Sequence, residues 1–220
     1  MDEKIATIKT WLGTGSINIF GLPFSGKDTV GVRLAEVLGA RFLSSGMILR
    51  DAAQNDLELG REMAQGKLAD TQKFRDIILP YFSREDLRDS ALVLSSVGRW
   101  DGEERDVIAS AAAANHPIKA ALLLNISEAE VFNRWVSLKD NTSDPRGLRS
   151  DDRDEATIRE RLDEFNVKTM PVILTYRSMD LLVSVFAHAS KDQVFENVID
   201  ALYDKAVEKE EREVLFTEAE

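Results

Sequence analysis

The stretch Ile17-Asn-Ile-Phe-Gly-Leu-Pro-Phe-Ser-Gly-Lys-Asp-Thr29 decides the fold of this chain. Its first four residues predict a short buried strand, and residues 30–38 repeat apolar side chains at the spacing of an amphipathic helix that ends at Gly39. Between the strand and the helix lies a loop with the spacing G-x-x-x-x-G-K. Such a loop wraps its backbone N–H groups around an anion, and the helix dipole and the lysine add positive potential. A glycine-rich turn with a surface lysine is the alternative, but the flanking strand and helix favour a nucleotide phosphate site.

Further apolar runs along the chain predict four more strands, at residues 41–43, 91–94, 120–124 and 181–186. Their runs are nearly continuous, which is typical of parallel strands buried on both faces. Capping boxes at Ser127–Glu130 and Ser190–Gln193 predict the starts of two helices between or after these strands. The alternation indicates an α/β fold with a doubly wound, parallel five-stranded sheet and helices on both faces.

The remaining segments predict one domain over residues 1–220, with its core in 1–44, 82–138 and 151–206. Residues 45–81 are polar and helical in pattern, which indicates a small flap. Residues 139–150 have the composition of a loop. The charged tail 207–220 predicts a fraying helix end or disorder, with no function implied.

Composition excludes several classes of protein. The 220 residues carry a formal net charge of -11, and a field of that sign disfavours binding to polymeric DNA or RNA. We find no apolar run that could span a bilayer and no secretory signal, so we expect no membrane partner and a cytoplasmic location. The absence of cysteine removes thiol catalysis, and His116 and His188 stand far apart in the chain.

The loop Gly21–Thr29 resembles the adenylate kinase form, G-x-P-G-x-G-K-G-T, with Phe24 and Asp28 in place of two family glycines. Later segments resemble family motifs in the same order, over roughly residues 16 to 205. Residues 44–50 resemble S-T-G-D-M-L-R, residues 95–99 stand in the place of D-G-F-P-R, and residues 63–69 resemble the turn over the acceptor base. Residues 149–162 resemble the R-x-D-D and R-L signature at the lid.

The resemblance implies a nucleoside monophosphate (NMP) kinase of the short-lid adenylate kinase type, with residues 45–81 as NMP-binding flap and residues 139–150 as lid. It implies ATP binding by Gly21, Pro23, Ser25, Gly26, Lys27, Asp28, Thr29 and Arg134. It implies NMP binding by Ser45, Arg50, Met63, Ala69, Ser96, Arg99 and Glu103. The catalytic set would be Lys27, Arg99, Arg149 and Arg161. AMP is the favoured acceptor, and a monomer is expected.

Phosphoryl transfer requires in-line positioning and positive charge rather than a nucleophile, which agrees with a candidate set made of cations. Each arginine also has a plainer interpretation. Arg161 fits a solvated helix face, Arg50 fits a helix C-terminus, and Arg99 could pair with Glu103 or Glu104. Their common order with the phosphate loop favours the functional interpretation.

Asp28 is unusual, because a carboxylate beside a triphosphate repels it unless a cation intervenes. The family holds the water shell of Mg²⁺ partly through an aspartate, and this chain has Ser95 at that position. We therefore hypothesise that Asp28 takes over this indirect role toward the Mg²⁺ that accompanies ATP. The alternative is an ordinary acidic residue at a helix N-terminus.

The acceptor base is less constrained, because Glu103 stands where the family has a glutamine that reads adenine. An ionised carboxylate only accepts hydrogen bonds, so it suits guanine N1–H and N2–H₂ better than adenine N1. A kinase specific for GMP or another NMP is therefore an alternative. Two others are a small-metabolite kinase that shares the loop and a nucleotide-binding regulator with weakened catalysis. The last is suggested by Phe24, Asp28, Ser95 and by Leu138, where the family has a further lid arginine.

Overall fold

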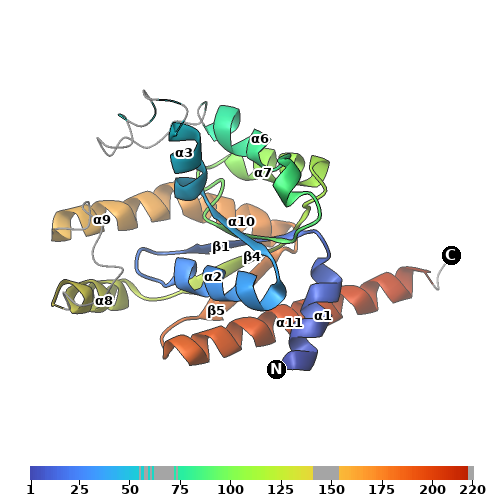
Figure 1. Cartoon of the computed structure of the whole chain (residues 1–220). Helices are drawn as coiled ribbons and strands as arrows, with labels where there is room; N and C mark the ends of the chain where they lie inside the picture. The colour runs from blue at the N-terminus through green and yellow to red at the C-terminus, as the bar shows by residue number, and fades with distance from the viewer. Residues whose placement is uncertain are drawn as a thin grey trace.

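Five parallel strands form the centre of the structure, a computed structural model that describes residues 1–54, 56, 59, 61, 72, 74–140 and 154–217 (Figure 1). The strands lie side by side in the order β2-β3-β1-β4-β5, and every neighbouring pair is parallel. Their bounds are β1 Ser16–Gly21, β2 Arg41–Ser44, β3 Leu92–Ser95, β4 Ile118–Asn125 and β5 Leu182–Phe186. All five predicted strands are confirmed, with shifts of one or two residues at their ends.

Helices cover both faces of the sheet, as the alternating pattern predicts (Figure 1). Apolar side chains of α1 (Asp2–Leu12), α2 (Lys27–Leu38) and α11 (Lys191–Thr217) join one buried cluster with those of the sheet. Those of α3 (Ser45–Ala53), α7 (Glu103–Ala113) and α10 (Met170–Ser178) join a second cluster. Neighbouring residues of one strand belong to different clusters, such as Val93 to the first and Leu94 to the second. This alternation follows from the two-residue period of a strand.

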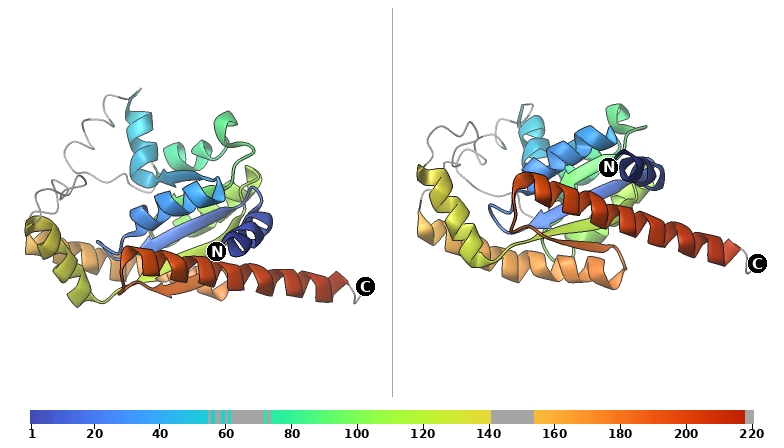
Figure 2. Two further views of the ribbon diagram at one scale, coloured as in Figure 1. Left: turned by 60° about the horizontal axis from the view of Figure 1, so that its bottom comes forward. Right: turned by 90° about the horizontal axis from the view of Figure 1, so that it is seen from below.

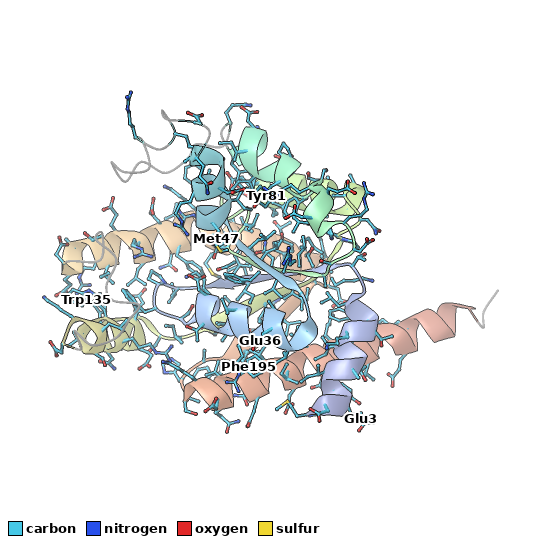
Figure 3. The ribbon with its side chains drawn as sticks, viewed as in Figure 1. Glu3, Glu36, Met47, Tyr81, Trp135 and Phe195 are labelled. Carbon is cyan, nitrogen blue, oxygen red and sulfur yellow. The ribbon has the colours of Figure 1, made fainter. Side chains whose placement is uncertain are left out.

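Short helical segments make up most of what the structure describes of residues 45–81, the predicted flap. The described parts of 45–81 are α3, a π-helix η1 at Phe74–Ile78 and α6 at Leu79–Tyr81, followed by a 3₁₀ turn η2 at Glu85–Leu87. Asp51 on α3 accepts hydrogen bonds at its Oδ2 from the hydroxyl of Tyr81 (3.1 Å), which Figure 3 labels, and from Arg84 (2.8 Å). These bonds hold the two ends of the region together at the sheet.

The strand order indicates where a binding crevice lies in this sheet. The chain passes from β1 through α2 to β2 on one side of β1, whereas β4 lies on the other side. Parallel sheets of this kind open a crevice at the carboxyl ends of the strands where the order reverses. The phosphate loop follows β1, and residues 96–99 follow β3, so both lie at this edge.

The second half of the chain adds α8 (Glu128–Asp140) and a continuous rod made of α9 (Glu155–Glu164), a π-helix η3 (Phe165–Thr169) and α10. Both predicted capping serines are confirmed: Ser127 Oγ accepts from Glu130 N at 3.2 Å, and Ser190 Oγ accepts from Gln193 N at 3.3 Å. Helix α8 runs to Asp140 and so includes the first two residues of the predicted lid. Among the described residues, no helix has the length and apolar character to cross a membrane.

Two helical segments exceed the sequence prediction. Helix α1 was not predicted, and α11 continues through the charged tail as far as Thr217 (Figure 2). Asp180, which follows α10, accepts hydrogen bonds from three cations of α11: Lys205, just before the tail, and Lys209 and Arg212 within it. This salt-bridge network stabilises the polar end of α11, which extends beyond the buried part of the helix.

Candidate active site

The phosphate loop joins β1, which ends at Gly21, to α2, which begins at Lys27. The loop is tightly folded, because a Cβ atom added to Gly21 would lie only 2.5 Å from Ser25 Oγ. Gly26 has φ +87°, in the left-handed region that favours glycine. Both glycines of the predicted motif are therefore required by the backbone, and Lys27 lies in the first turn of α2, whose N-terminal N–H groups attract anions.

Phe24 has a backbone conformation in the left-handed region, which favours glycine. Its φ is +60°, which L-residues other than Gly, Asn and Asp rarely adopt. The ring is partly buried and packs against the buried cluster that contains the α2 side chains. The turn at this position is therefore made by a partly buried phenylalanine in a conformation that favours glycine.

Asp28 and Ser95 meet at the crevice. Ser95 ends β3, and its Oγ donates a hydrogen bond of 2.5 Å to Asp28 Oδ1 on the first turn of α2. Ser95 is 4% exposed. The carboxylate of Asp28 thus reaches the side chain that stands at the position of the family's aspartate.

A cleft beside the loop brings together three of the four predicted catalytic residues, Lys27, Arg99 and Arg161. Pro23 and Ser96 from the predicted binding sets also line it. The complete lining is Gly21, Pro23, Lys27, Ser96, Arg99, Trp100, Arg161, Glu164, Phe165, Lys168 and Thr169. The phosphate loop, the segment after β3 and the α9–η3 rod therefore converge on one space, as transfer between two bound phosphates requires.

Several predicted NMP-binding residues lie at the ends of β2 and β3. Ser45 Oγ donates to the backbone oxygen of Ser96 at 3.1 Å, so two predicted NMP-binding residues are in contact. Arg50 lies one helical turn beyond Gly46, and a Cβ on that glycine would lie 3.3 Å from the Arg50 guanidinium. Below them Asn18 on β1 donates to the backbone oxygen of Val97 at 2.7 Å and fixes the segment after β3.

Glu103 is buried and hydrogen-bonded to the backbone, whereas a residue that recognises a base would face an open site. It is 4% exposed, and its Oε2 accepts a hydrogen bond of 3.2 Å from the backbone N–H of Trp100. Neighbouring Glu104 is also buried, and its Oε2 accepts from Gly102 N at 2.8 Å. Both carboxylates thus satisfy N–H groups around the start of α7, where the helix dipole favours negative charge.

Arg134 connects the phosphate loop to two other elements. From α8 its guanidinium donates to the backbone oxygens of Phe24 (3.2 Å) and Ser25 (3.4 Å) in the loop and of Ala187 (2.6 Å) after β5. Its Nε also donates to Glu130 at 2.7 Å. This bond is the main reason that the pKa of the Glu130 carboxyl is held below its ordinary value. The side chain of Arg134 is 26% exposed.

Three predicted residues, Met63, Ala69 and Arg149, lie outside the described residues. Conversely, the cleft is also lined by four residues that the sequence pattern does not predict: Trp100, Glu164, Phe165 and Lys168. A signal for part of this set exists, because residues 161, 164, 165 and 168 have the spacing of one helical face. Their arrangement in the cleft also depends on the π-helix η3, which sequence periodicity does not indicate.

Known proteins resemble this chain in sequence over most of its length. A family model described as an AAA domain matches residues 20–159. An adenylate kinase of Chlamydia muridarum is 31% identical over 220 residues, covering 84% of this chain and 85% of the relative. An adenylate kinase of Parasynechococcus marenigrum (strain WH8102) is 31% identical over 194 residues, covering 83% of this chain and 95% of the relative.

A solved structure supports the fold. A gluconokinase from Sinorhizobium meliloti 1021 superposes with a TM-score of 0.58 at 17% sequence identity, covering 94% of this chain and 98% of that chain. At this identity the likeness concerns the fold alone. It agrees with the parallel α/β sheet described above.

Proposed function

Because this chain belongs to the adenylate kinase family of phosphotransferases, we propose that it transfers the γ-phosphoryl group of ATP to a nucleoside monophosphate, with AMP as the favoured acceptor. The observation that carries the proposal is the meeting of Lys27, Arg99 and Arg161 around one cleft beside the phosphate loop. These cations come from three separate parts of the chain. Positive charge focused on one point inside an acidic protein suits a transferred phosphoryl group.

The donor nucleotide would bind at the start of α2. The N–H groups of the loop and Lys27 would hold its phosphates, and Arg134 would stack on its adenine. Three hydrogen bonds fix the guanidinium of Arg134 against the loop and against Ala187, and a fourth joins it to Glu130 on its own helix. A pre-arranged guanidinium loses little freedom when a base stacks on it, which favours binding.

The acceptor would bind between the flap and the segment after β3. Arg50 and Arg99 would hold its phosphate, with Ser45 and Ser96 at the adjoining strand ends. We further propose that residues 45–81 act as the flap and residues 139–150 as a short lid that contributes Arg149. Closure over both nucleotides would exclude water, which otherwise competes as phosphoryl acceptor.

The residues at the crevice fit Mg²⁺, which prefers oxygen ligands and usually retains several waters beside one or two carboxylates. Asp28 and Ser95 supply a carboxylate and a hydroxyl that are already in contact. Among the described residues no group of three or more His, Cys, Asp or Glu side chains surrounds a common point. The ion would therefore be held largely by the nucleotide phosphates and water, with Asp28 contacting its water shell. When bound, it neutralises charge on the phosphates.

AMP is proposed on the strength of the relatives, and GMP is the second candidate because of Glu103. The local bonds of Glu103 with the start of α7 favour AMP over this alternative. The buried carboxylate already accepts a hydrogen bond of 3.2 Å from Trp100 N, which supports a role at the start of the helix. The base would then be read by other groups of the acceptor site.

A coupled assay with ATP and each of AMP, GMP, CMP and UMP, run with and without Mg²⁺, tests the proposal. We expect Mg²⁺-dependent turnover with AMP that exceeds turnover with the other three. Lys27→Met should remove it, while Lys119→Met on β4 serves as a control with the same change of charge. Binding of ATP without turnover on any acceptor would instead indicate a regulator with weakened catalysis.

A further inference from the structure

Resting on the proposed function, we propose that Lys168 is a further substrate-binding residue, which holds the phosphate of the acceptor nucleotide. Trp100 would position its ammonium group. The observation behind this assignment is that Lys168 and Trp100 line the same cleft as Lys27, Arg99 and Arg161 and contact each other within it. Neither residue belongs to the site that the sequence pattern predicts.

Lys168 is brought to the cleft by an irregular helix. It belongs to η3, and three of the five residues of this π-helix line the cleft. Single π-turns inside α-helices are rare and often occur at functional sites, because the wider turn redirects side chains. Here the wider turn lies between Arg161, at the end of α9, and the buried part of α10. It therefore adds a second cation to the cleft close to the first.

The contacts of Lys168 place its ammonium group on the acceptor side. Its Nζ lies 4.9 Å from the centre of the Trp100 ring, and Trp100 directly follows Arg99 in the segment after β3. The phosphate loop forms the donor side of the same cleft. A cation attracted to the face of the Trp100 ring is therefore held toward the acceptor phosphate rather than toward the adenine end of ATP.

The second contact of Lys168 is one that a substrate can replace. Its Nζ lies 2.7 Å from Glu164 Oε1, four residues earlier, and the two side chains are 41% and 34% exposed. A partly exposed pair of this kind contributes little to stability. A lysine has a long flexible side chain, so its ammonium can turn from one carboxylate oxygen to a phosphate oxygen without moving the helix.

The charge of the cleft favours such an exchange. Its lining contains four cationic side chains, those of Lys27, Arg99, Arg161 and Lys168, and one carboxylate, that of Glu164. The whole chain has a net charge of -11, so this concentration of positive charge is local. Two nucleotides that meet end to end bring several negative charges into the same space, and each added cation reduces their mutual repulsion.

The test compares Lys168→Met, Lys168→Arg and a control, Lys4→Met. Lys4 has the same kind of environment on α1, far from the cleft. Its Nζ lies 2.8 Å from Asp200 Oδ1 and 5.5 Å from the centre of the Tyr203 ring. Figure 3 labels the preceding residue, Glu3, on the side of the molecule away from α9. For each variant we would measure the KM for acceptor and for ATP, kcat, the melting temperature, and acceptor affinity by calorimetry.

We expect Lys168→Met to raise the KM and the Kd for the acceptor about 10-fold while the KM for ATP stays within twofold. Lys168→Arg should keep the acceptor affinity within about threefold, and Lys4→Met should change neither nucleotide. The melting temperatures of all variants should stay close to that of the wild type. This separation of acceptor from donor is a result that a purely structural salt bridge would not give.

An acceptor Kd within twofold of wild type in Lys168→Met would overturn the inference, and so would an equal loss for ATP and acceptor. The proposed function fails differently. In that case the wild-type chain itself would bind and phosphorylate none of the four monophosphates, and the inference would be rejected together with it.

Discussion

Ser95 and Asp28 form a hydrogen bond of 2.5 Å between the end of β3 and the first turn of α2. Both residues depart from the family pattern, which has an aspartate at position 95 and a glycine at position 28. One position has lost its aspartate, and a new aspartate has appeared on the neighbouring element with its carboxylate directed to the same place. The hydrogen bond therefore brings the carboxylate of Asp28 to the position where the family pattern has its aspartate.

If Asp28 serves Mg²⁺ in this way, Asp28→Asn should raise the Mg²⁺ concentration needed for half-maximal turnover by about 10-fold, because outer contacts to a metal typically have effects of this size. Mg²⁺ titrations at saturating ATP measure this. Asp192→Asn is the control, since Asp192 is also an acidic residue in the first turn of a helix, α11. An unchanged Mg²⁺ optimum in Asp28→Asn would show that the carboxylate only complements the helix dipole.

Phe24 allows a test of the loop conformation. At its φ of +60° a β-branched residue is strained by about 1–2 kcal/mol, whereas glycine is not. We expect Phe24→Val to weaken ATP binding and Phe24→Gly to retain it, although both remove the ring. Calorimetric titration with ATP checks this pair. An equal loss of affinity relative to wild type in both variants would mean that the ring, and not the backbone, determines the loop.

Arg134→Met should lower the free energy of unfolding by about 1–3 kcal/mol, because it leaves backbone oxygens of the loop and of Ala187 without their donor. It should also lower ATP affinity about 10-fold through the loosened loop and the lost stacking surface. Denaturant unfolding and calorimetry measure the two effects. Arg88→Met is the control, since Arg88 forms an exposed salt bridge with Glu85 and its loss should change stability by about 0.5 kcal/mol or less.

The Asp180 cluster predicts a dependence of stability on pH. Hydrogen bonds from Lys209 and Lys205 hold the pKa of the Asp180 carboxyl below its ordinary value. A carboxyl with a lowered folded-state pKa stabilises the protein above its unfolded pKa, and this contribution is lost as the pH falls toward the folded value. Asp180→Asn should therefore cost about 1 kcal/mol at pH 7, and the difference from wild type should shrink below about pH 4.

Unfolding curves of wild type and Asp180→Asn between pH 3 and pH 8 would measure that difference. Asp200→Asn is a suitable control, because Asp200 forms a salt bridge with one lysine, Lys4, and is 55% exposed. Its effect should be smaller at every pH. A difference for Asp180→Asn that stayed constant down to pH 3 would contradict the assigned role of the ionised carboxylate.

Much of this fold follows from local sequence signals. The strands are continuous apolar runs, and two helices begin at serines whose side chains accept the capping bonds that the pattern predicts. The end of α2 at Gly39, with φ +69°, is equally local. Such features depend on neighbouring residues, so they can be predicted without knowledge of the packing.

Other features depend on contacts between distant segments. Helix α1 has few sequence signals and is fixed by packing of Ile8 and Leu12 into the cluster shared with α11. The extension of α11 depends on Asp180, 25 residues before Lys205. In the site, the contact of Asp28 with Ser95 and the π-helix that carries Lys168 arise from tertiary packing. The sequence gives the residue types at these positions, but it does not show that the side chains come into contact.

The central claim is that two nucleotides bind end to end around the cations of one cleft. Titration with a dinucleoside polyphosphate that spans both nucleotide sites, followed by calorimetry, tests it most directly. We predict that one molecule binds per chain, raises the melting temperature, and loses at least about 10-fold in affinity in Lys27→Met and in Arg99→Met. Absence of binding heat together with an unchanged melting temperature in the wild-type chain would contradict the claim.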